Sequence, residues 1–240
     1  MELPGLYIGN LKSKLPIVQG GMAIRVSTAP LAAAVADAGG VGTIAGTGMS
    51  VEELVGEIRE ARRLTRGIIG VNVLFAARNF AALVKAALKE KVDFIVSGAG
   101  FSRDMFAWGK EFNVPILPIV SSVRLARLAE KMGAAALVVE GKEAGGHLGT
   151  GEPLVKLLPE VRRAVGSPLI AAGGIANGKE AARMLALGAD GVQLATRFIA
   201  SEECAVPENY KEMHLNVDPG NIVLVESPVG LPGRAIKNRF

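Results

Sequence analysis

Short runs of almost wholly apolar residues alternate along the chain with longer segments in which apolar residues recur every three or four positions. The short runs are typical of parallel strands covered on both faces, and the longer segments are typical of helices with one buried side. We expect strands over residues 16–21, 41–46, 68–75, 93–100, 115–120, 135–141, 168–174 and 191–198. We expect helices between them over residues 28–38, 50–65, 79–91, 103–112, 122–132, 153–165 and 177–187.

Eight strand–helix units in succession predict an α/β fold of the (β/α)8 TIM barrel type, and a doubly wound parallel sheet is the alternative. After the eighth strand, residues 201–215 are a weaker candidate for the last helix, and residues 221–227 look extended. Residues 234–240 read as the start of a further helix, so we expect a missing or short C-terminal segment. The expected organisation is a barrel over 1–200 and a C-terminal extension over 201–240, the start of a small segment that returns to the barrel. Whether the native chain continues past its last residue is left open.

The composition narrows the class of protein without pointing to a reaction. Half of the residues are hydrophobic, and the net charge is only +4, with no cluster of Lys and Arg of the kind that binds nucleic acid. The single cysteine, Cys204, excludes an internal disulfide and any metal site built from several cysteines, and it points to a reducing compartment. We find no signal-peptide core and no apolar run long enough to span a membrane, so we expect a cytoplasmic protein.

Glycine and small polar residues end most of the expected strands, and in a barrel these ends meet at the face that carries the active site. Gly173 and Gly174 end the seventh strand, and Asn177 followed by Glu180 predicts a capped helix start beside them. Thr196, at the end of the eighth strand, offers a hydroxyl and an N–H near the same place. Free N–H groups at a helix N-terminus bind phosphate, so we expect the phosphate of flavin mononucleotide (FMN) or of a sugar phosphate here.

The ends of the first and third expected strands provide a second group of candidate residues. Gly21 and Met22 would offer their backbone to a flat ring. Asn72 lies on an otherwise apolar strand, where a buried amide needs partners for both its donor and its acceptor atoms. Either a ligand or neighbouring backbone would provide those partners.

The stretch EAGGHLG places a histidine among glycines after the sixth expected strand. His147 either exchanges protons with a substrate near neutral pH or only anchors a flexible loop. Glu140, which ends that strand, is a weaker candidate for a polar contact near the site. The other histidine, His214, falls beyond the barrel and is expected at the surface. Neither histidine has acidic residues at metal-ligand spacing, so no divalent metal is expected.

Taken in order, the motifs PIVQGGMA, GVNVL, EAGGHLG, AAGGIANG, QLATRF and SPVGLPGRAIKN resemble the nitronate monooxygenase family, formerly called 2-nitropropane dioxygenases. This family includes flavin-dependent enoyl reductases that act on acyl carrier protein thioesters. The resemblance implies a TIM barrel with a smaller added segment, non-covalent FMN as cofactor, and His147 as the catalytic residue. By the same resemblance, the positions that bind FMN are Gly21, Met22, Asn72, Gly173, Gly174, Gln193, Ala195 and Thr196.

The resemblance leaves three functions open. We favour FMN-dependent oxidation of alkyl nitronates with O2, because SPVGLPGRAIKN is closer to family members that bear the name nitronate monooxygenase. The second function is reduction of enoyl thioesters, with NADH or NADPH as co-substrate and acyl carrier protein as partner. The third is a flavin-binding barrel without turnover, and a homodimer is left open.

Two related types of barrel enzyme are excluded because this sequence lacks the residues that they need. The inosine monophosphate dehydrogenase type needs a nucleophilic cysteine in a loop after a middle strand, whereas Cys204 follows the eighth strand. The dihydroorotate dehydrogenase type needs a basic residue near the flavin, and no residue can be assigned to that position.

Overall fold

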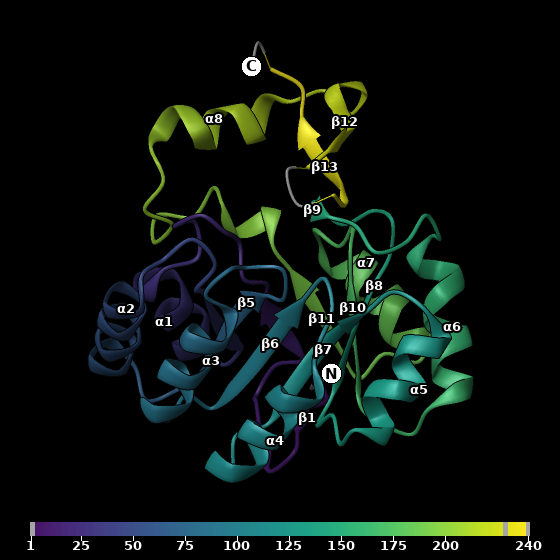
Figure 1. Cartoon of the computed structure of the whole chain (residues 1–240). Helices are drawn as coiled ribbons and strands as arrows, with labels where there is room; N and C mark the ends of the chain where they lie inside the picture. The colour runs from purple at the N-terminus through teal and green to yellow at the C-terminus, as the bar shows by residue number, and fades with distance from the viewer. Residues whose placement is uncertain (1–2, 228–229, 239–240) are drawn as a thin grey trace.

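The computed structural model describes residues 3–227 and 230–238 and contains a closed barrel of eight parallel strands (Figure 1). The order around the barrel is β10-β11-β3-β4-β5-β6-β7-β8, which makes the first and last barrel strands neighbours. The TIM-barrel prediction is therefore confirmed. The barrel strands are β3 (Ile17–Gln19), β4 (Val41–Ala45), β5 (Ile68–Leu74), β6 (Phe94–Gly98), β7 (Ile116–Val120), β8 (Leu137–Glu140), β10 (Leu169–Ala172) and β11 (Gly191–Leu194).

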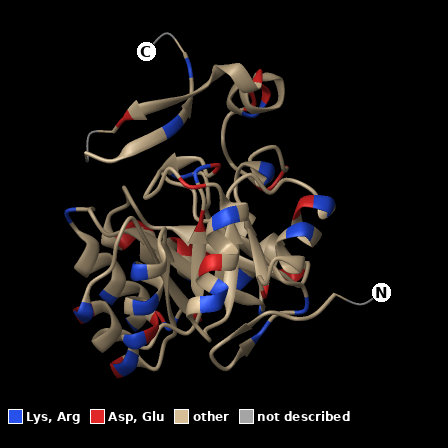
Figure 2. Ribbon diagram, turned by 90° about the vertical axis from the view of Figure 1, so that its right-hand side faces the viewer, with Lys and Arg blue, Asp and Glu red and all other residues tan. Residues whose placement is uncertain are grey.

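Helices follow the barrel strands and form an outer layer, and each overlaps a helix expected from the sequence. Lys and Arg are mixed with Asp and Glu over the outer surface of this layer (Figure 2). The outer helices are α1 (Ala29–Asp37), α2 (Val51–Leu64), α3 (Phe80–Lys89), α4 (Arg103–Phe112), α5 (Val123–Lys131), α6 (Leu154–Ala164) and α7 (Gly178–Ala186).

Capping side chains fix where several of these helices begin. Ser50, Ser102, Ser122 and Asn177 each accept a hydrogen bond from the backbone N–H three residues later. Such a bond satisfies a donor that has no partner inside the helix. Because the caps set the first turn of each helix, they also set the length of the loop between the strand and its helix, where the site lies.

Apolar side chains fill the barrel and close its amino-terminal end. The chain begins with a hairpin of β1 (Tyr7–Ile8) and β2 (Leu11–Lys12). Leu6 and Ile8 are only 1% exposed and pack with Phe94 and Val138 in one cluster inside the barrel. A ligand can therefore approach the barrel interior from the carboxyl ends of the strands.

The rest of the chain lies above those carboxyl ends, as Figure 1 shows. It contains α8 (Glu208–Asn216), the short helical turn η2 (Pro219–Asn221), β12 (Ile222–Glu226) and β13 (Pro232–Ile236). β13 pairs antiparallel with β12 on one side and with β9 (Gly146–His147) on the other. The extended structure expected over residues 221–227 is confirmed for Ile222–Glu226, while Asn221 ends η2.

Two expectations about the C-terminal part of the chain are wrong. Residues 201–215 do not form the last barrel helix: β11 is followed by the short turn η1 (Thr196–Phe198), and α8 has no buried residue and lies above the barrel. Residues 234–236 belong to β13 and do not start a helix, while 239 and 240 lie outside the described residues. The strand forms by pairing with β12 on one side and with β9 on the other. The loop that carries β9 is far from β13 in the sequence, since the Arg234 side chain donates to the carbonyl of Lys142, 92 positions earlier.

Candidate functional site

A ring of polar side chains lies inside the barrel at the carboxyl ends of the strands. Thr43 and Glu140 each follow, by two positions, a residue of the apolar cluster inside the barrel, so they point to the same inner face. Asn72 on β5 reaches the loop after β3, and Gln193 on β11 lies against Gly20 of that loop. These four side chains form the floor of the candidate site.

The Asn72 amide is only half satisfied by the protein. Its Nδ2 donates to the carbonyl oxygen of Gly21 at 3.1 Å, whereas its Oδ1 is buried and has no hydrogen-bond partner among the described residues. A buried acceptor without a donor is costly, and it is a common sign of an absent ligand or water. A Cβ on Gly21 would lie 2.5 Å from the Asn72 Cβ, so only glycine permits this close approach.

A buried glutamine that sequence reasoning missed holds the loop after β3. The Gln19 Nε2 donates to the Gly20 carbonyl at 2.6 Å and to the Ser27 Oγ at 2.8 Å, and its Oε1 accepts from the Thr43 N–H at 2.9 Å. Ser27 Oγ in turn accepts from the Met22 N–H at 2.9 Å. The Met22 carbonyl accepts from the Ser27 N–H at 3.0 Å, so both polar backbone groups of Met22 are engaged within the loop. Its partly buried side chain packs beside the apolar cluster that contains Cys204. The sequence signal for this role is that Gln19 is the one polar side chain in the apolar run PIVQGG.

The seventh strand ends in a turn that requires glycine. Gly173 and Gly174 have φ of +113° and +69°, which residues with a side chain rarely adopt. A Cβ on Gly173 would lie 3.0 Å from the Ala144 backbone nitrogen, and one on Gly174 would lie 3.0 Å from the Glu143 Cβ. The turn therefore brings bare backbone against the loop that carries His147.

The start of α7 beside this turn has the predicted capping arrangement. Asn177 Oδ1 accepts from the Glu180 N–H at 3.0 Å, and Glu180 Oε2 accepts from the Ala176 N–H at 2.6 Å. α7 begins only four residues after Gly174, and the positive end of a helix dipole favours an anion near the N-terminus of the helix.

The end of β11 adjoins both the turn and the histidine loop. Gln193 and Leu194 belong to β11, and Ala195 and Thr196 lead into the turn η1. A Cβ on Gly145 would lie 3.8 Å from the Thr196 Oγ1, so the hydroxyl is next to the histidine loop. The predicted residues of β10 and β11 are thus brought to one side of the barrel mouth.

The loop that carries His147 is held at both ends in spite of its glycines. At its base, the Gly141 N–H donates to the Ala172 carbonyl at 3.1 Å, and the Lys142 N–H donates to the Glu152 carbonyl at 2.9 Å. At its top, Gly146 and His147 form β9 and pair with β13 of the C-terminal segment. His147 is half-buried on this strand, above the carboxyl ends of the barrel strands.

Two carboxylates near this loop have different roles. Glu143 Oε2 accepts from the Leu154 N–H at 3.0 Å and so caps α6, which begins after a proline and has no capping side chain of its own. This long-range cap was not foreseen. Burial raises the pKa of Glu140 to about 7, and no ion pair or hydrogen bond of its carboxyl group occurs in the described part of the chain.

Other candidate residues lie elsewhere. The Cys204 Sγ contacts the Val26 carbonyl at 3.6 Å in a separate apolar cluster. His214 is on α8, where its Nδ1 lies 2.8 Å from the Tyr210 carbonyl and its ring packs on the Tyr210 ring. Across residues 3–227 and 230–238, we find no group of three or more His, Cys, Asp or Glu side chains that could hold a metal ion.

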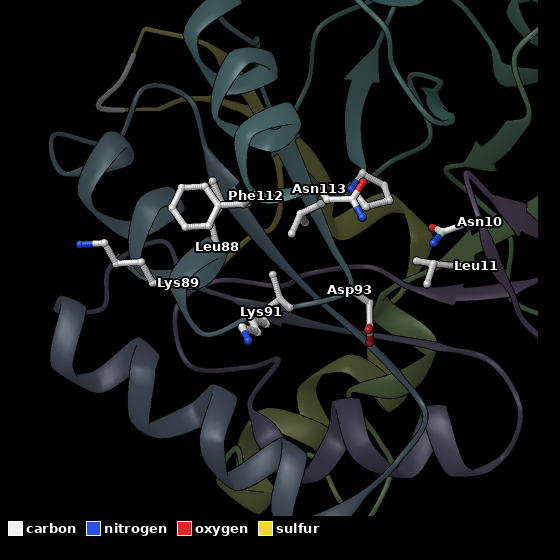
Figure 3. A pocket seen from close by; sticks show the side chains of 11 residues that line it. Asn10, Leu11, Leu88, Lys89, Lys91, Asp93, Phe112 and Asn113 are labelled. Carbon is white, nitrogen blue, oxygen red and sulfur yellow. The ribbon is translucent and has the colours of Figure 1, made fainter.

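A hollow of about 420 Å³ lies at the other end of the barrel (Figure 3). Its lining includes Lys89 at the end of α3, Lys91 just after that helix, Asp93 before β6, and Phe112 and Asn113 at the end of α4. These positions precede strands, so the hollow is not part of the candidate site.

None of the described helices is long and apolar enough to cross a membrane.

The fold and these residues define a TIM-barrel protein with a candidate site at the carboxyl ends of its strands. The family model described as Nitronate monooxygenase matches residues 6–87 and 74–240. The chain therefore belongs to the nitronate monooxygenase family, whose members are oxidoreductases.

Named relatives and solved structures support this assignment. The chain is 33% identical over 228 residues to a (3aS,4S,5R,7aS)-5-hydroxy-7a-methyl-1-oxo-octahydro-1H-indene-4-carboxyl-CoA dehydrogenase of Mycobacterium tuberculosis, covering 94% of this chain and 64% of the relative. It is 32% identical to a probable nitronate monooxygenase of Staphylococcus aureus, covering 96% and 77%. The chain thus spans just under two thirds of the mycobacterial relative.

Two solved structures share both the fold and part of the sequence. FabK from Thermotoga maritima superposes with a TM-score of 0.90 at 39% identity, covering 95% of this chain and 72% of that one. Nitroalkane oxidase from Streptomyces ansochromogenes superposes with a TM-score of 0.86 at 32% identity, covering 95% and 78%.

Proposed function

We propose that this protein is an FMN-dependent oxidoreductase that oxidises alkyl nitronates with O2. The observation that carries the cofactor proposal is the Asn72 Oδ1, a buried acceptor without a donor, beside the bare backbone of Gly21. The imide N–H of a flavin ring is a donor of the kind that this oxygen lacks. We also propose the division into an FMN-binding barrel over 1–200 and an extension over 201–240.

The proposed phosphate site is the turn after β10 together with the start of η1. Gly173 and Gly174 offer backbone without side chains at the N-terminus of α7, and Thr196 adds a hydroxyl. Gln193 and Ala195 would line the path between the phosphate and the ring. Gly21, Met22 and Asn72 would hold the ring on the other side of the mouth.

FMN supplies the redox chemistry when bound, since it accepts electrons from a substrate and passes them to O2. We assign His147 the role of general base. With a neutral nitroalkane, a neutral imidazole takes the proton from the carbon next to the nitro group. With a nitronate that proton is already gone, and the ring would only hydrogen-bond the anionic oxygens. The pairing of β9 with β13 holds the backbone of His147 above the mouth, which supports this assignment.

A second candidate function is reduction of an enoyl thioester by NADH or NADPH. Its substrate class, a thioester, is supported by the relatives from Mycobacterium tuberculosis and Rhodococcus jostii, 33% and 32% identical, which are named as dehydrogenases of a carboxyl-CoA compound. A thioester substrate would be carried by coenzyme A or by acyl carrier protein, and His147 would then polarise the substrate or give it a proton.

Anaerobic mixing distinguishes these functions. The purified yellow protein is mixed with propyl-2-nitronate, NADH or NADPH, and loss of the flavin absorbance is followed by stopped flow. Bleaching by the nitronate alone supports the first function, and bleaching by a nicotinamide cofactor supports the second. A protein that cannot be loaded with FMN contradicts both, and a loaded protein that no reagent bleaches would be a flavin-binding barrel without turnover.

A further inference from the structure

The C-terminal strand β13 is fastened to the histidine loop at several points. Gly233 pairs with His147 and Arg234 pairs with Gly146 in the antiparallel register. The Leu148 N–H donates to the Pro232 carbonyl at 2.8 Å. These contacts give the top of the loop its strand conformation.

Arg234 adds a contact to the base of the same loop. Its Nη1 donates to the Lys142 carbonyl at 2.7 Å, so one side chain of β13 joins the strand at the top of the loop to the backbone near its start. No carboxylate pairs with Arg234 in the described part of the chain. The guanidinium is thus committed to the loop backbone, and a hydrogen bond from a charged donor is stronger than one from a neutral donor.

The residue opposite His147 in the antiparallel pair is Gly233, which is buried and presents no side chain toward the imidazole. Side chains that face each other across an antiparallel pair lie on the same face, with Cβ atoms about 4.5–5.5 Å apart. Gly233 has no side chain, and its φ is not in the left-handed region. A Cβ at this position would lie 3.6 Å from the Gly146 carbonyl and 3.7 Å from the Val225 Cγ2 on β12, both ordinary contacts, so the backbone itself does not require glycine here.

The loop needs such external support because of its composition. Gly145, Gly146, Gly149 and Gly151 flank His147, and glycine loses more conformational freedom on ordering than any other residue. A titratable ring held only by such a loop would occupy many positions, whereas acid–base catalysis needs the ring within hydrogen-bond reach of one proton.

We infer that β13 positions His147, with Arg234 as a positioning residue that fixes the loop and Gly233 as the residue that presents no side chain toward the imidazole. The catalytic value of this positioning rests on the proposed function. The positioning itself is a property of the backbone and is measurable without any substrate.

The first test compares Arg234→Ala, Arg234→Lys and Lys237→Ala. Lys237 follows β13 and is exposed. Lys237→Ala therefore removes one positive charge, as Arg234→Ala does, but it removes no contact to the loop. Amide hydrogen exchange of a peptide covering residues 145–149 should quicken about tenfold or more in Arg234→Ala, the size expected when a charged hydrogen bond is lost. It should stay at the wild-type rate in Lys237→Ala and return toward that rate in Arg234→Lys, whose ammonium can donate to the same carbonyl.

Turnover of a neutral nitroalkane gives a second readout of the same variants. In Arg234→Ala, kcat should fall about tenfold with a smaller change in KM, and FMN content should match the wild type. Wild-type exchange of residues 145–149 in Arg234→Ala would overturn the inference. Faster exchange in a protein whose wild type is inert on every substrate would support the positioning and count against the proposed function.

Gly233→Val tests the absence of a side chain opposite His147. Valine favours strand structure, so exchange of the loop should remain slow, while the added side chain should lower kcat on the nitroalkane about tenfold or more. A Gly233→Val protein with slow exchange and wild-type kcat would show that the absence of a side chain opposite His147 has no role and would overturn that part of the inference.

Discussion

Asn72 shows how a single side chain can mark a site. Its Nδ2 is used to hold the loop after β3, and its Oδ1 remains buried without a donor among the described residues. A purely structural asparagine on an apolar strand would satisfy both atoms from the protein. The sequence shows a polar amide on an otherwise apolar strand. It does not show whether the amide is structural or binds a ligand, because that depends on its contact with the Gly21 carbonyl, 51 positions earlier in the chain.

His147→Ala should separate proton transfer from binding. The variant should keep FMN, because the proposed contacts to the cofactor come from other loops. Activity on neutral nitroalkanes should fall ~10²–10⁴-fold, as is typical when an acid–base group is removed. Nitronates should lose only a hydrogen bond to a charged group, worth roughly 1–3 kcal/mol.

Steady-state assays on matched nitroalkane and nitronate pairs measure this asymmetry, with His214→Ala as the control for a histidine on α8. Equal losses on both substrates would assign His147 to anchoring the loop and would contradict its role as a base.

Glu140 predicts a dependence of stability on pH. Burial raises its pKa to about 7, so the folded protein holds this proton to a higher pH than the unfolded chain does. The contribution of Glu140 to the free energy of unfolding is therefore most favourable below about pH 4.5, falls as the pH rises to about 7, and is constant above that. Glu140→Gln cannot ionise, so it should be more stable than the wild type by about 1–3 kcal/mol at about pH 8 and equal to it at about pH 4.

Urea unfolding at the two pH values measures this difference, and Glu226→Gln on the exposed strand β12 is the matched control. A constant difference between Glu140→Gln and the wild type across this pH range would show that the carboxyl group is solvated.

At the scale of elements, the barrel could be predicted almost completely and the C-terminal segment could not. Each barrel strand is a local apolar run and each outer helix has a local period, so eight strands and seven helices are visible in the sequence. β13 exists through its pairing with β12 and with β9, and the β9 partner is not signalled by any nearby residue. The Glu143 cap on α6 and the Gln19 bond to Thr43 were missed for the same reason.

The turn between β10 and α7 gives a prediction at this scale. Gly174→Val places a β-branched side chain at φ +69° and against the Glu143 side chain, a conformation that costs about 1–3 kcal/mol. The turn should deform, and FMN binding should weaken by about tenfold or more because the backbone no longer faces the phosphate.

Fluorescence titration of the apoprotein with FMN gives the dissociation constant. Gly220→Ala is the control, because a Cβ there meets nothing within 4 Å. A wild-type dissociation constant in Gly174→Val would place the phosphate elsewhere.

At the scale of the whole molecule, the site is assembled from loops that are spread over the entire barrel. Asn72 on β5 and the residues after β3 lie on one side of the mouth. Gln193 on β11 and the residues after β10 and β11 lie on the other side, and the C-terminal segment lies above them. The proposed ring site, the proposed phosphate site and His147 thus meet at one mouth. Among the described residues, no group of His, Cys, Asp or Glu side chains there could bind a metal ion.

Removal of metal should therefore leave function unchanged. Dialysis against EDTA is expected to retain both the FMN absorbance and the turnover of the wild-type protein, as measured before and after treatment. A loss of turnover that zinc or manganese restores would contradict this expectation.

The pairing of β3 with β11 has a consequence for how the protein is made. Val192 sits beside Ile17, so the ring of strands cannot close until nearly the whole barrel has left the ribosome. Contacts between residues so distant in the sequence form late, because the loop that joins them must first be closed at an entropic cost. Until then the edge of β3 that faces away from β4 is unpaired, and an apolar strand with an unpaired edge is a template for association with other chains. The nascent chain should accordingly depend most on chaperones in the interval before residue 192 emerges.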